Sequence, residues 1–313
     1  MEKSMQPTYS VLDLGSNSFH MIYARVEEDG RIAVLDKFKQ YVSLGAGLKK
    51  NGEIRESYQH AAINCLREAS RVIRKQNPTY FSAVATNAFR CQKDDYFKNL
   101  CERALGRPIR VLSSEEEGDY IYRGVVQTTP LSGQDHCILD IGGSSTEFIL
   151  GSGARASCIL SWQLGSAVLT ERFFDTRMLR PANWQAAVDY ADETITLAGK
   201  GRINLPGIQT MYGASGAIRA ISNTMIKLGI NDTGIIDAEA VEELVQRLLN
   251  IRIGSHFKHL DRYRVQVFLG GLAILHTLFE LLDVHDLKPA RGAIREGVLL
   301  ELHQQAHTTA KAA

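Results

Sequence analysis

Two segments of the chain carry the same pattern, in which an aspartate, an apolar residue and a glycine precede small polar residues. They read DLGSNS at residues 13–18 and DIGGSS at residues 140–145. Each follows one short apolar run and leads into another, which predicts a strand, a tight turn and a second strand. Backbone amides of such turns can surround an anion, and the polar side chains add further donors. The pattern therefore predicts two phosphate-binding turns, each preceded by an aspartate that can hold a metal ion or its water.

A third loop rich in small residues covers residues 212–219, between an apolar stretch and a predicted helix. The first amides of such a helix can point at an anion, which would place Gly213 and Ser215 against a phosphate. A loop of this kind is equally common as a plain tight turn, so it leaves both interpretations open by itself. Its occurrence together with two similar turns in a duplicated chain favours phosphate binding.

Three consecutive glutamates, Glu115 to Glu117, fall in the first turn of a helix that Ser113 or Ser114 can cap. Acidic residues in this position favour the helix dipole and need no other role. The alternative is that one of them is a general base, which deprotonates water for attack on phosphorus. Glu147, just past the second turn, is a further carboxylate that can help to hold Mg²⁺ or water.

Arg90 follows a strand predicted at residues 81–86. A guanidinium in this position can bind two phosphate oxygens at once and stabilise the charge that develops on a transferred phosphoryl group. The alternative is a surface arginine at the start of a helix, where a positive charge is electrostatically unfavourable.

The predicted elements form two versions of one βββαβαβα unit, and residues 128–133 are the predicted linker. In the first version, strands are expected at residues 9–39, 81–86 and 109–112, with helices at residues 56–76, 95–105 and from residue 113. In the second, strands from residue 137 give way to helices at residues 181–197, 214–228 and 238–249.

The composition excludes several classes of protein. The 313 residues suffice for two domains, and 36 basic against 35 acidic residues leave a formal net charge of +1, so no overall field draws the chain to nucleic acid or membranes. Five scattered cysteines and no apolar run of transmembrane length predict a cytoplasmic protein without nucleic-acid or membrane partners.

The pair His256 and His259 lacks companion ligands and is not expected to bind metal. Neither a P-loop NTPase nor a Rossmann dehydrogenase is supported, because their glycine motifs are absent.

Taken together, these motifs resemble the exopolyphosphatase/guanosine pentaphosphate phosphohydrolase family, within the superfamily of actin, heat-shock chaperone ATPases and sugar kinases. The matching stretches are residues 11–20, 85–90, 112–118, 139–147, 164–166, 169–174, 213–221 and 295–297. The resemblance implies an α/β fold with two actin-like (ribonuclease H-like) domains around a cleft. The first would cover residues 1–128, completed by a C-terminal helix at 295–313, and the second residues 129–294.

The resemblance also implies removal of a terminal phosphate that depends on Mg²⁺, with Mn²⁺ as the alternative ion. It gives Glu117 the role of general base and places Arg90 on the scissile phosphate. It places Asp140 and Glu147 beside the metal ion and its water. Asp13, which stands at the end of a predicted strand, is a further candidate metal ligand. The expected phosphate ligands are Ser16, Asn17, Ser18, Gly142, Gly143, Ser144, Ser145, Gly213 and Ser215.

Three departures from the family pattern concern the second turn, the glutamate motif and the C-terminus. Ser144 stands where the family usually has a third glycine, and Gly118 and Asp119 replace the common Ala-Arg. Long members carry a further helical domain that this sequence does not include. We therefore expect a preference for shorter polyphosphate chains.

The favoured hypothesis is an exopolyphosphatase that cuts the terminal phosphoanhydride bond of inorganic polyphosphate. The second is the same chemistry on guanosine pentaphosphate, which would connect the protein to the stringent response. A third is a non-catalytic sensor that binds polyphosphate or an alarmone, and a fourth is an ATP-dependent small-molecule kinase. The sequence does not fix the oligomeric state, and a homodimer is one alternative.

Overall fold

The contacts within the chain divide it into two compact units. Unit 1 comprises Met1–Thr129 and Gly292–Ala313, and unit 2 comprises Pro130–Arg291. The domain divisions predicted from the sequence, after residue 128 and before residue 295, lie one and three residues from these positions. The computed structural model describes residues 6–49, 51–175, 178–199, 210–249, 251, 260, 262–282 and 284–312.

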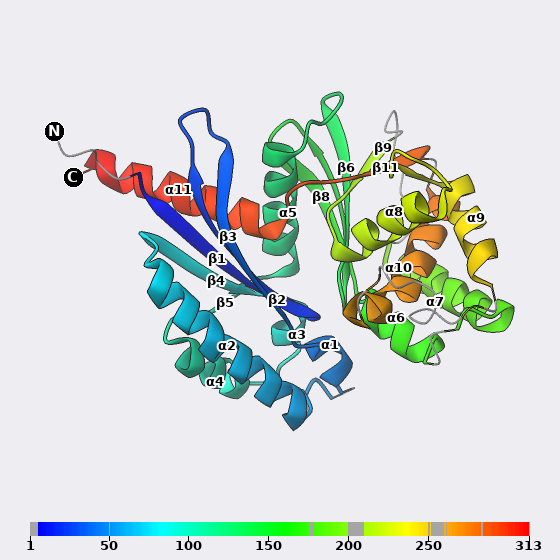
Figure 1. Cartoon of the computed structure of the whole chain (residues 1–313), viewed down its shortest axis with the longest axis horizontal. Helices are drawn as coiled ribbons and strands as arrows, with labels where there is room; N and C mark the ends of the chain where they lie inside the picture. The colour runs from blue at the N-terminus through cyan, green and yellow to red at the C-terminus, as the bar shows by residue number, and fades with distance from the viewer. Residues whose placement is uncertain are drawn as a thin grey trace. The chain divides into compact units, whose positions relative to one another are not determined.

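Unit 1 is built on a five-stranded mixed sheet in the order β3-β2-β1-β4-β5 (Figure 1). The first three strands pair antiparallel, whereas β4 runs parallel to β1 and β5 runs parallel to β4. The strands are β1 (Thr8–Leu14), β2 (Ser18–Val26), β3 (Ile32–Tyr41), β4 (Tyr80–Ala85) and β5 (Arg110–Val111). This order is the actin-like, or ribonuclease H-like, arrangement, and the predicted fold class is confirmed.

The helices of unit 1 follow the apolar spacing of the sequence. The long helix α2 buries a face that includes Ala62, Leu66 and Ile73. Its C-cap, Asn77, has a left-handed backbone conformation and precedes a proline. The helices are α1 (Leu44–Gly47), α2 (Glu56–Gln76), α3 (Asn87–Arg90), α4 (Tyr96–Leu105), α5 (Ser114–Thr128) and α11 (Ile294–Ala312).

Alternate residues of β1 serve the two faces of this sheet. Leu12 and Leu14 belong to the hydrophobic core that also contains the buried side chains of α2 and α4. Tyr9 and Asp13 contact α11, the first through His303 and the second through an ion pair. A strand with helices on both sides of its sheet is buried along most of its length, and residues 9–12 and 14 of β1 are buried.

The helices α5 and α11 of unit 1 approach each other at backbone distance, because glycines stand at their contact. A Cβ atom at Gly124 would lie 1.9 Å from the carbonyl oxygen of Ala293, and one at Gly297 would lie 2.0 Å from that of Tyr120. Neither position has room for a side chain, and the obstacle in both cases is backbone that cannot rotate away. The C-terminal helix is therefore fixed in unit 1 by close packing that only glycine permits.

Replacing Gly297 with alanine should force α11 away from α5 and destabilise unit 1 by about 1–3 kcal/mol or more, the range for inserting atoms into a filled space. Thermal unfolding of the variant should show a clearly lowered midpoint. The matched control is Gly216→Ala, since a Cβ there meets no atom within 4 Å. Equal midpoints for the two variants would contradict the close packing.

The contact of α11 with β1 also predicts a dependence of stability on pH. The Nδ1 atom of His303 lies 2.9 Å from the Tyr9 hydroxyl, and its ring meets that of His307 edge-on at 4.3 Å. Burial, and next the neighbouring His307, lower the pKa of His303 below its usual 6.5. A histidine with a lowered pKa favours the neutral form in the folded state, so its contribution to stability is complete above pH 6.5 and is lost as the pH falls through the folded pKa.

Denaturant unfolding at several pH values should therefore show the wild type losing stability below pH 6.5 more steeply than His303→Gln, which cannot titrate. The slope against pH reports the difference in bound protons between the unfolded and folded states. Parallel curves for the two proteins would show that His303 does not couple to folding.

Unit 2 contains a six-stranded sheet in the order β10-β11-β9-β6-β7-β8. Its strands are β6 (Asp135–Ile141), β7 (Thr146–Ser152), β8 (Arg155–Trp162), β9 (Thr210–Gly213), β10 (Ile236–Asp237) and β11 (Asp286–Pro289). The meander β6-β7-β8 and the parallel strands β9 and β11 repeat the plan of unit 1. The short strand β10 is an addition, antiparallel to β11 at the sheet edge.

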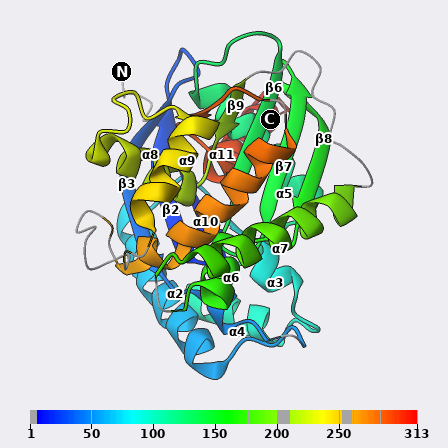
Figure 2. The same cartoon turned by 90° about the vertical axis from the view of Figure 1, so that its right-hand side faces the viewer.

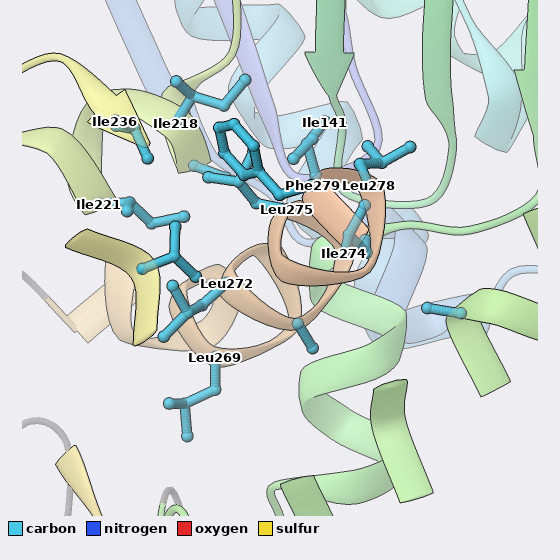
Figure 3. Close-up of a cluster of buried hydrophobic side chains, with 14 of the residues drawn as sticks. Ile141, Ile218, Ile221, Ile236, Leu269, Leu272, Ile274, Leu275, Leu278 and Phe279 are labelled. Carbon is cyan, nitrogen blue, oxygen red and sulfur yellow. The ribbon is translucent and has the colours of Figure 1, made fainter. Parts of the chain in front are cut away.

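A long apolar helix forms the centre of the helical layer of unit 2 (Figure 2). The helices are α6 (Ser166–Phe173), α7 (Pro181–Gly199), α8 (Gly216–Leu228), α9 (Ala238–Leu248) and α10 (Arg262–Leu281). The helix α10 contacts the other four. Figure 3 shows its Leu272 and Leu275 among Ile218 and Ile221 of α8 and Ile141 at the end of β6.

This helix corrects one expectation from the sequence. Within the described residues, Tyr263–Leu281 is long and apolar enough to cross a membrane by length and composition, with a mean hydropathy of 1.3. The sequence was expected to contain no such segment. About three quarters of the apolar window, 76%, is buried, as in the core helix of a globular domain, so the helix is weak evidence for a membrane span.

Candidate functional site

Three chemistry-bearing segments of unit 1 lie at one edge of its sheet. Leu14, Ala85 and Val111 are neighbours in the parallel register of β1, β4 and β5. Because the carboxyl ends of these strands coincide, the first Asp-Gly turn, the helix that carries Arg90 and the helix that carries Glu117 all begin at this edge. Ligands of open α/β sheets bind at such carboxyl ends.

The first turn joins β1 to β2 and is held in place through its carbonyl groups. The Ser16 carbonyl accepts from the Gly45 amide of α1 at 2.8 Å, and the Asn17 carbonyl accepts from the amides of Val42 and Ser43 at 3.0 and 2.9 Å. Ser16 is buried, whereas Asn17 and Ser18 are half-buried. The predicted phosphate ligands of unit 1 are thus brought together on one fixed turn.

The second turn, between β6 and β7 of unit 2, is fixed in the same way. The Gly142 amide donates to the Ser145 carbonyl at 2.9 Å, and the Gly142 and Gly143 carbonyls accept from the first amides of α6 at 2.9 and 3.0 Å. A Cβ at Gly165 would lie 2.2 Å from Ser144, so only glycine permits this approach. In both units, the helix after the meander therefore fixes the turn. Ser144 and Ser145 are buried within it.

In the third loop, residues 212–219, both candidate phosphate ligands have a structural role, which the sequence alone could not separate from phosphate binding. Ser215 caps α8, because its hydroxyl oxygen accepts from the Ile218 amide at 3.0 Å. A Cβ at Gly213 would lie 2.7 Å from Ile218, and the Gly213 carbonyl accepts from the Ala290 amide at 2.7 Å. Capping and packing account for both residues, and their role in phosphate binding stays a prediction.

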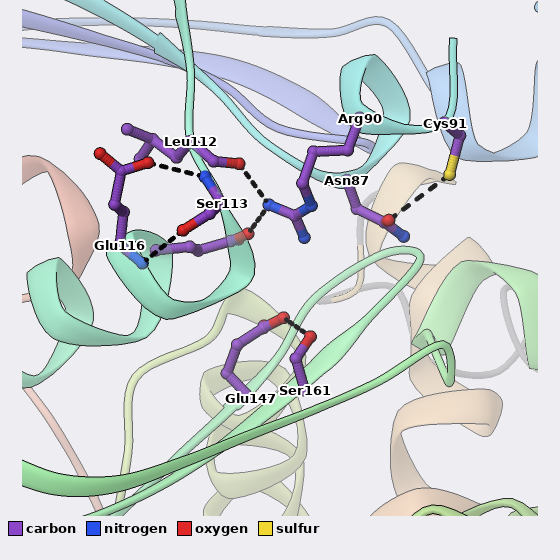
Figure 4. Close-up of polar contacts among 9 residues, drawn as sticks. Asn87, Arg90, Cys91, Leu112, Ser113, Glu116, Glu147 and Ser161 are labelled. Carbon is purple, nitrogen blue, oxygen red and sulfur yellow. Dashed lines mark hydrogen bonds and ion pairs between the residues drawn. The ribbon is translucent and has the colours of Figure 1, made fainter. Parts of the chain in front are cut away.

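The structure gives the three glutamates of α5 separate environments. Glu116 forms a capping box with Ser113: each side chain bonds the backbone amide of the other residue, at 2.8 and 3.1 Å (Figure 4). Glu115 is exposed, whereas Glu117 is 7% exposed. The sequence carried a signal for the capping role, since serine followed three residues later by glutamate is typical of a helix start.

Arg90 and Glu117 form an ion pair that is largely buried. The Nη1 atom of Arg90 lies 2.6 Å from Oε2 of Glu117 and donates to the Leu112 carbonyl at 3.0 Å (Figure 4). The two side chains are only 17% and 9% exposed. The other terminal nitrogen of Arg90, Nη2, is buried and has no hydrogen-bond partner among the described residues. A buried donor of this kind is costly unless a ligand satisfies it.

Two acidic residues of unit 2 lie directly opposite each other on neighbouring strands. Asp140 on β6 pairs with Glu147 on β7, and Glu147 pairs in turn with Ser161 on β8. The Ser161 hydroxyl donates to Oε1 of the buried Glu147 at 2.9 Å (Figure 4). Carboxylates opposite each other destabilise a sheet, and a bound cation would relieve their repulsion. This oxygen donor set fits Mg²⁺, although the described residues contain no group of three or more potential ligands.

The corresponding row of unit 1 differs. Asp13 lies opposite His20, which lies opposite Lys39. The Oδ2 atom of Asp13 is 3.6 Å from Nη1 of Arg295, at the start of α11. An arginine thus balances this aspartate, and a metal role for Asp13 stays a prediction. Sequence reasoning missed the ion pair, although Arg295 belonged to one of the matching stretches.

The pair His256 and His259 lies outside the described residues, so the expectation that it binds no metal is not tested.

The fold places the chain in the actin-like class, with one Asp-Gly turn between the first two strands of the meander in each unit. A model of the Ppx/GppA phosphatase family matches residues 22–306, and the chain belongs to this family. Proteins named guanosine-5′-triphosphate,3′-diphosphate pyrophosphatase are similar in sequence, with 33% identity over 302 residues in Vibrio parahaemolyticus and 34% over 301 in Vibrio atlanticus. Each match covers 95% of this chain but 59% of the relative, so the chain spans about three fifths of these relatives' length.

Solved structures of the family share the fold. The Aquifex aeolicus PPX-GPPA enzyme superposes with a TM-score of 0.74 at 23% identity, over 94% of this chain and 99% of that one. An exopolyphosphatase from Cytophaga hutchinsonii superposes with a TM-score of 0.82 at 20% identity, over 95% and 98% of the two chains. These similarities extend over both units.

Proposed function

We propose that this chain hydrolyses the terminal phosphoanhydride bond of a polyphosphorylated substrate, with Glu117 as the general base. The observation that carries the proposal is the buried Arg90–Glu117 pair at the carboxyl edge of the unit 1 sheet. Membership of a phosphatase family supports it. A carboxylate held in one orientation can accept a proton from water as that water attacks phosphorus.

The residues of each unit have their own part in this reaction. In unit 1, Arg90 orients Glu117 through Nη1, while its buried Nη2 can donate to a phosphate oxygen and stabilise developing charge. In unit 2, the amides and hydroxyls of residues 142–145 can donate to phosphate oxygens. The water oxygen bonds to the terminal phosphorus while Glu117 takes up its proton. The bond from that phosphorus to the bridging oxygen breaks, so that inorganic phosphate is released and the shortened chain leaves with the electron pair.

Asp140 and Glu147 are the residues that would hold Mg²⁺ in unit 2. When bound, the ion supplies positive charge that offsets the negative charge of the phosphate chain. Ser161 orients Glu147 for this role through the bond from its hydroxyl. A titration of wild type and Asp140→Asn with Mg²⁺, read by calorimetry, would test the ligand assignment without requiring turnover.

Two substrates remain candidates, because different observations favour them. The sequence ranked inorganic polyphosphate first, with a preference for short chains. The relatives at 33–34% identity are named for a guanosine pentaphosphate substrate, which favours the nucleotide at least as well. Both substrates end in the same phosphoanhydride bond, so one set of residues serves either.

The experiment that tests the function measures phosphate release, with Mg²⁺ present, from tripolyphosphate, long-chain polyphosphate and guanosine pentaphosphate. Glu117→Gln serves as the control for contaminating phosphatases. A higher kcat/KM for the nucleotide would establish the pentaphosphate hydrolase, and a higher value for tripolyphosphate than for long polymer would establish the short-chain exopolyphosphatase. Binding without release from any substrate would overturn hydrolysis and favour a sensor.

A further inference from the structure

A surface hollow on unit 1 lies outside the residues proposed for hydrolysis. Its lining combines one face of α4 with the loop that follows the left-handed Gly106. The lining residues are Tyr96, Asn99, Glu102, Arg103, Arg107 and Pro108. Arg107 stacks on Phe81 near the start of β4, so this part of the hollow lies toward the amino ends of the parallel strands, whereas Arg90 follows their carboxyl ends.

Tyr96 presents an aromatic ring to solvent. The residue is 65% exposed, although the next residue, Phe97, is buried and stacks on Phe89 with a centroid distance of 5.2 Å. Phe97 therefore fixes the start of α4 to the core, while the ring of Tyr96 is left without comparable burial. An exposed aromatic ring is a surface on which a planar group can stack.

The charges around the hollow leave a positive balance. The Glu102 carboxylate has two partners other than these arginines: its Oε1 accepts a hydrogen bond from the Ile109 amide at 2.8 Å and lies 3.0 Å from the Lys98 ammonium. Arg103 and Arg107 form no ion pair with an acid in the part of the chain that the structure describes. The guanidinium of Arg107 lies 5.1 Å from the centre of the Phe81 ring, which restricts its orientation.

A purely structural explanation covers part of this arrangement. Arg103 stands in the last turn of α4, where a cation favours the helix dipole. That explanation does not apply to Arg107, which lies beyond the helix, or to the exposure of Tyr96. Tyr96 and Arg103 are seven residues apart, or about 10 Å along a helix axis. The Tyr96 ring and the Arg103 guanidinium therefore belong to different parts of the hollow.

We propose that this hollow binds a nucleoside 5′-diphosphate or triphosphate at a site separate from the hydrolytic one. The base stacks on Tyr96, and the phosphate oxygens bind the guanidinium groups of Arg103 and Arg107. The Asn99 amide, between them on the same helix face, supplies a donor and an acceptor for the base or the ribose. The proposal stands whether or not the chain hydrolyses nucleotides.

The test uses the full chain and a fluorescent probe, N-methylanthraniloyl ADP, with binding followed by anisotropy. Tyr96→Leu and Arg103→Gln should each weaken binding roughly tenfold, since loss of one stacking or charged contact has an effect of this order. Tyr96→Phe, which keeps the ring, should bind as the wild type does. Arg71→Gln, at an exposed position of α2, is the matched charge control and should leave the affinity unchanged.

Further variants separate this site from the hydrolytic one. Binding that persists in Ser145→Ala and Glu117→Gln but weakens in the α4 variants supports the proposal. Binding lost in Ser145→Ala and unchanged in Tyr96→Leu would overturn it, as would absence of binding in the wild type. Competition by pyrophosphate as strong as that by unlabelled ADP would show an anion site without base recognition, and this too would overturn it. Both Tyr96 and Arg103 lie on the surface, and unchanged circular dichroism would confirm that the variants fold.

Discussion

Replacing Glu117 with glutamine is expected to lower kcat for phosphate release by about 10² to 10⁴-fold, the contribution of a positioned general base. Glutamine keeps the shape of the side chain and can still contact Arg90, but its amide does not take up the proton from water. The value of KM should change little, because the substrate phosphates are expected to bind the turns rather than Glu117. Steady-state phosphate release, measured over a range of substrate concentrations, separates the two constants.

The neighbouring glutamates provide the controls for this prediction. Glu115 is exposed, so Glu115→Gln should retain activity. Glu116→Gln can keep the reciprocal capping bonds, since glutamine serves at this position as glutamate does. A loss in Glu115→Gln as large as that in Glu117→Gln would mean that the charge of the helix start, rather than one base, is required.

Much of the fold could be predicted because its signals are local. The helix at residues 56–76 was predicted with the bounds that α2 has, since its apolar spacing and the proline after it are both visible in the sequence. The Asp-Gly turns were found at the ends of β1 and β6 for a similar reason. The duplicated pattern also predicted two versions of one βββαβαβα unit, and the two sheets have the same strand order apart from β10.

The pairing of the site residues could not be predicted, because it depends on contacts between distant parts of the chain. Arg90 and Glu117 are 27 residues apart, and only the parallel register of β4 and β5 brings their helices together. The ion pair between Asp13 and Arg295 needs the return of α11 to unit 1, which the resemblance implied but no spacing in the sequence shows. Local patterns identify candidate groups, whereas topology decides which of them meet.

Replacing Arg90 with methionine is expected to reduce kcat by about 10² to 10³-fold, the usual effect of removing one group that stabilises transition-state charge. The same change should destabilise the protein by about 3–5 kcal/mol, because it removes the cation of a buried ion pair and leaves the Glu117 carboxylate behind. Arg90→Lys should be inactive or nearly so while losing less stability, since an ammonium keeps the charge but not the planar set of donors.

A double-mutant cycle with Glu117→Gln separates the two effects of Arg90. If the stability loss comes from the buried carboxylate, the double variant Arg90→Met/Glu117→Gln should be more stable than Arg90→Met alone, with a coupling energy of about 0.5–3 kcal/mol. Its activity should remain as low as that of the worse single variant, because stability restored in this way does not replace either chemical group. Additive stability losses would show that the two side chains do not interact in solution. The ion pair would then orient neither residue, and Glu117 would need another group to position it.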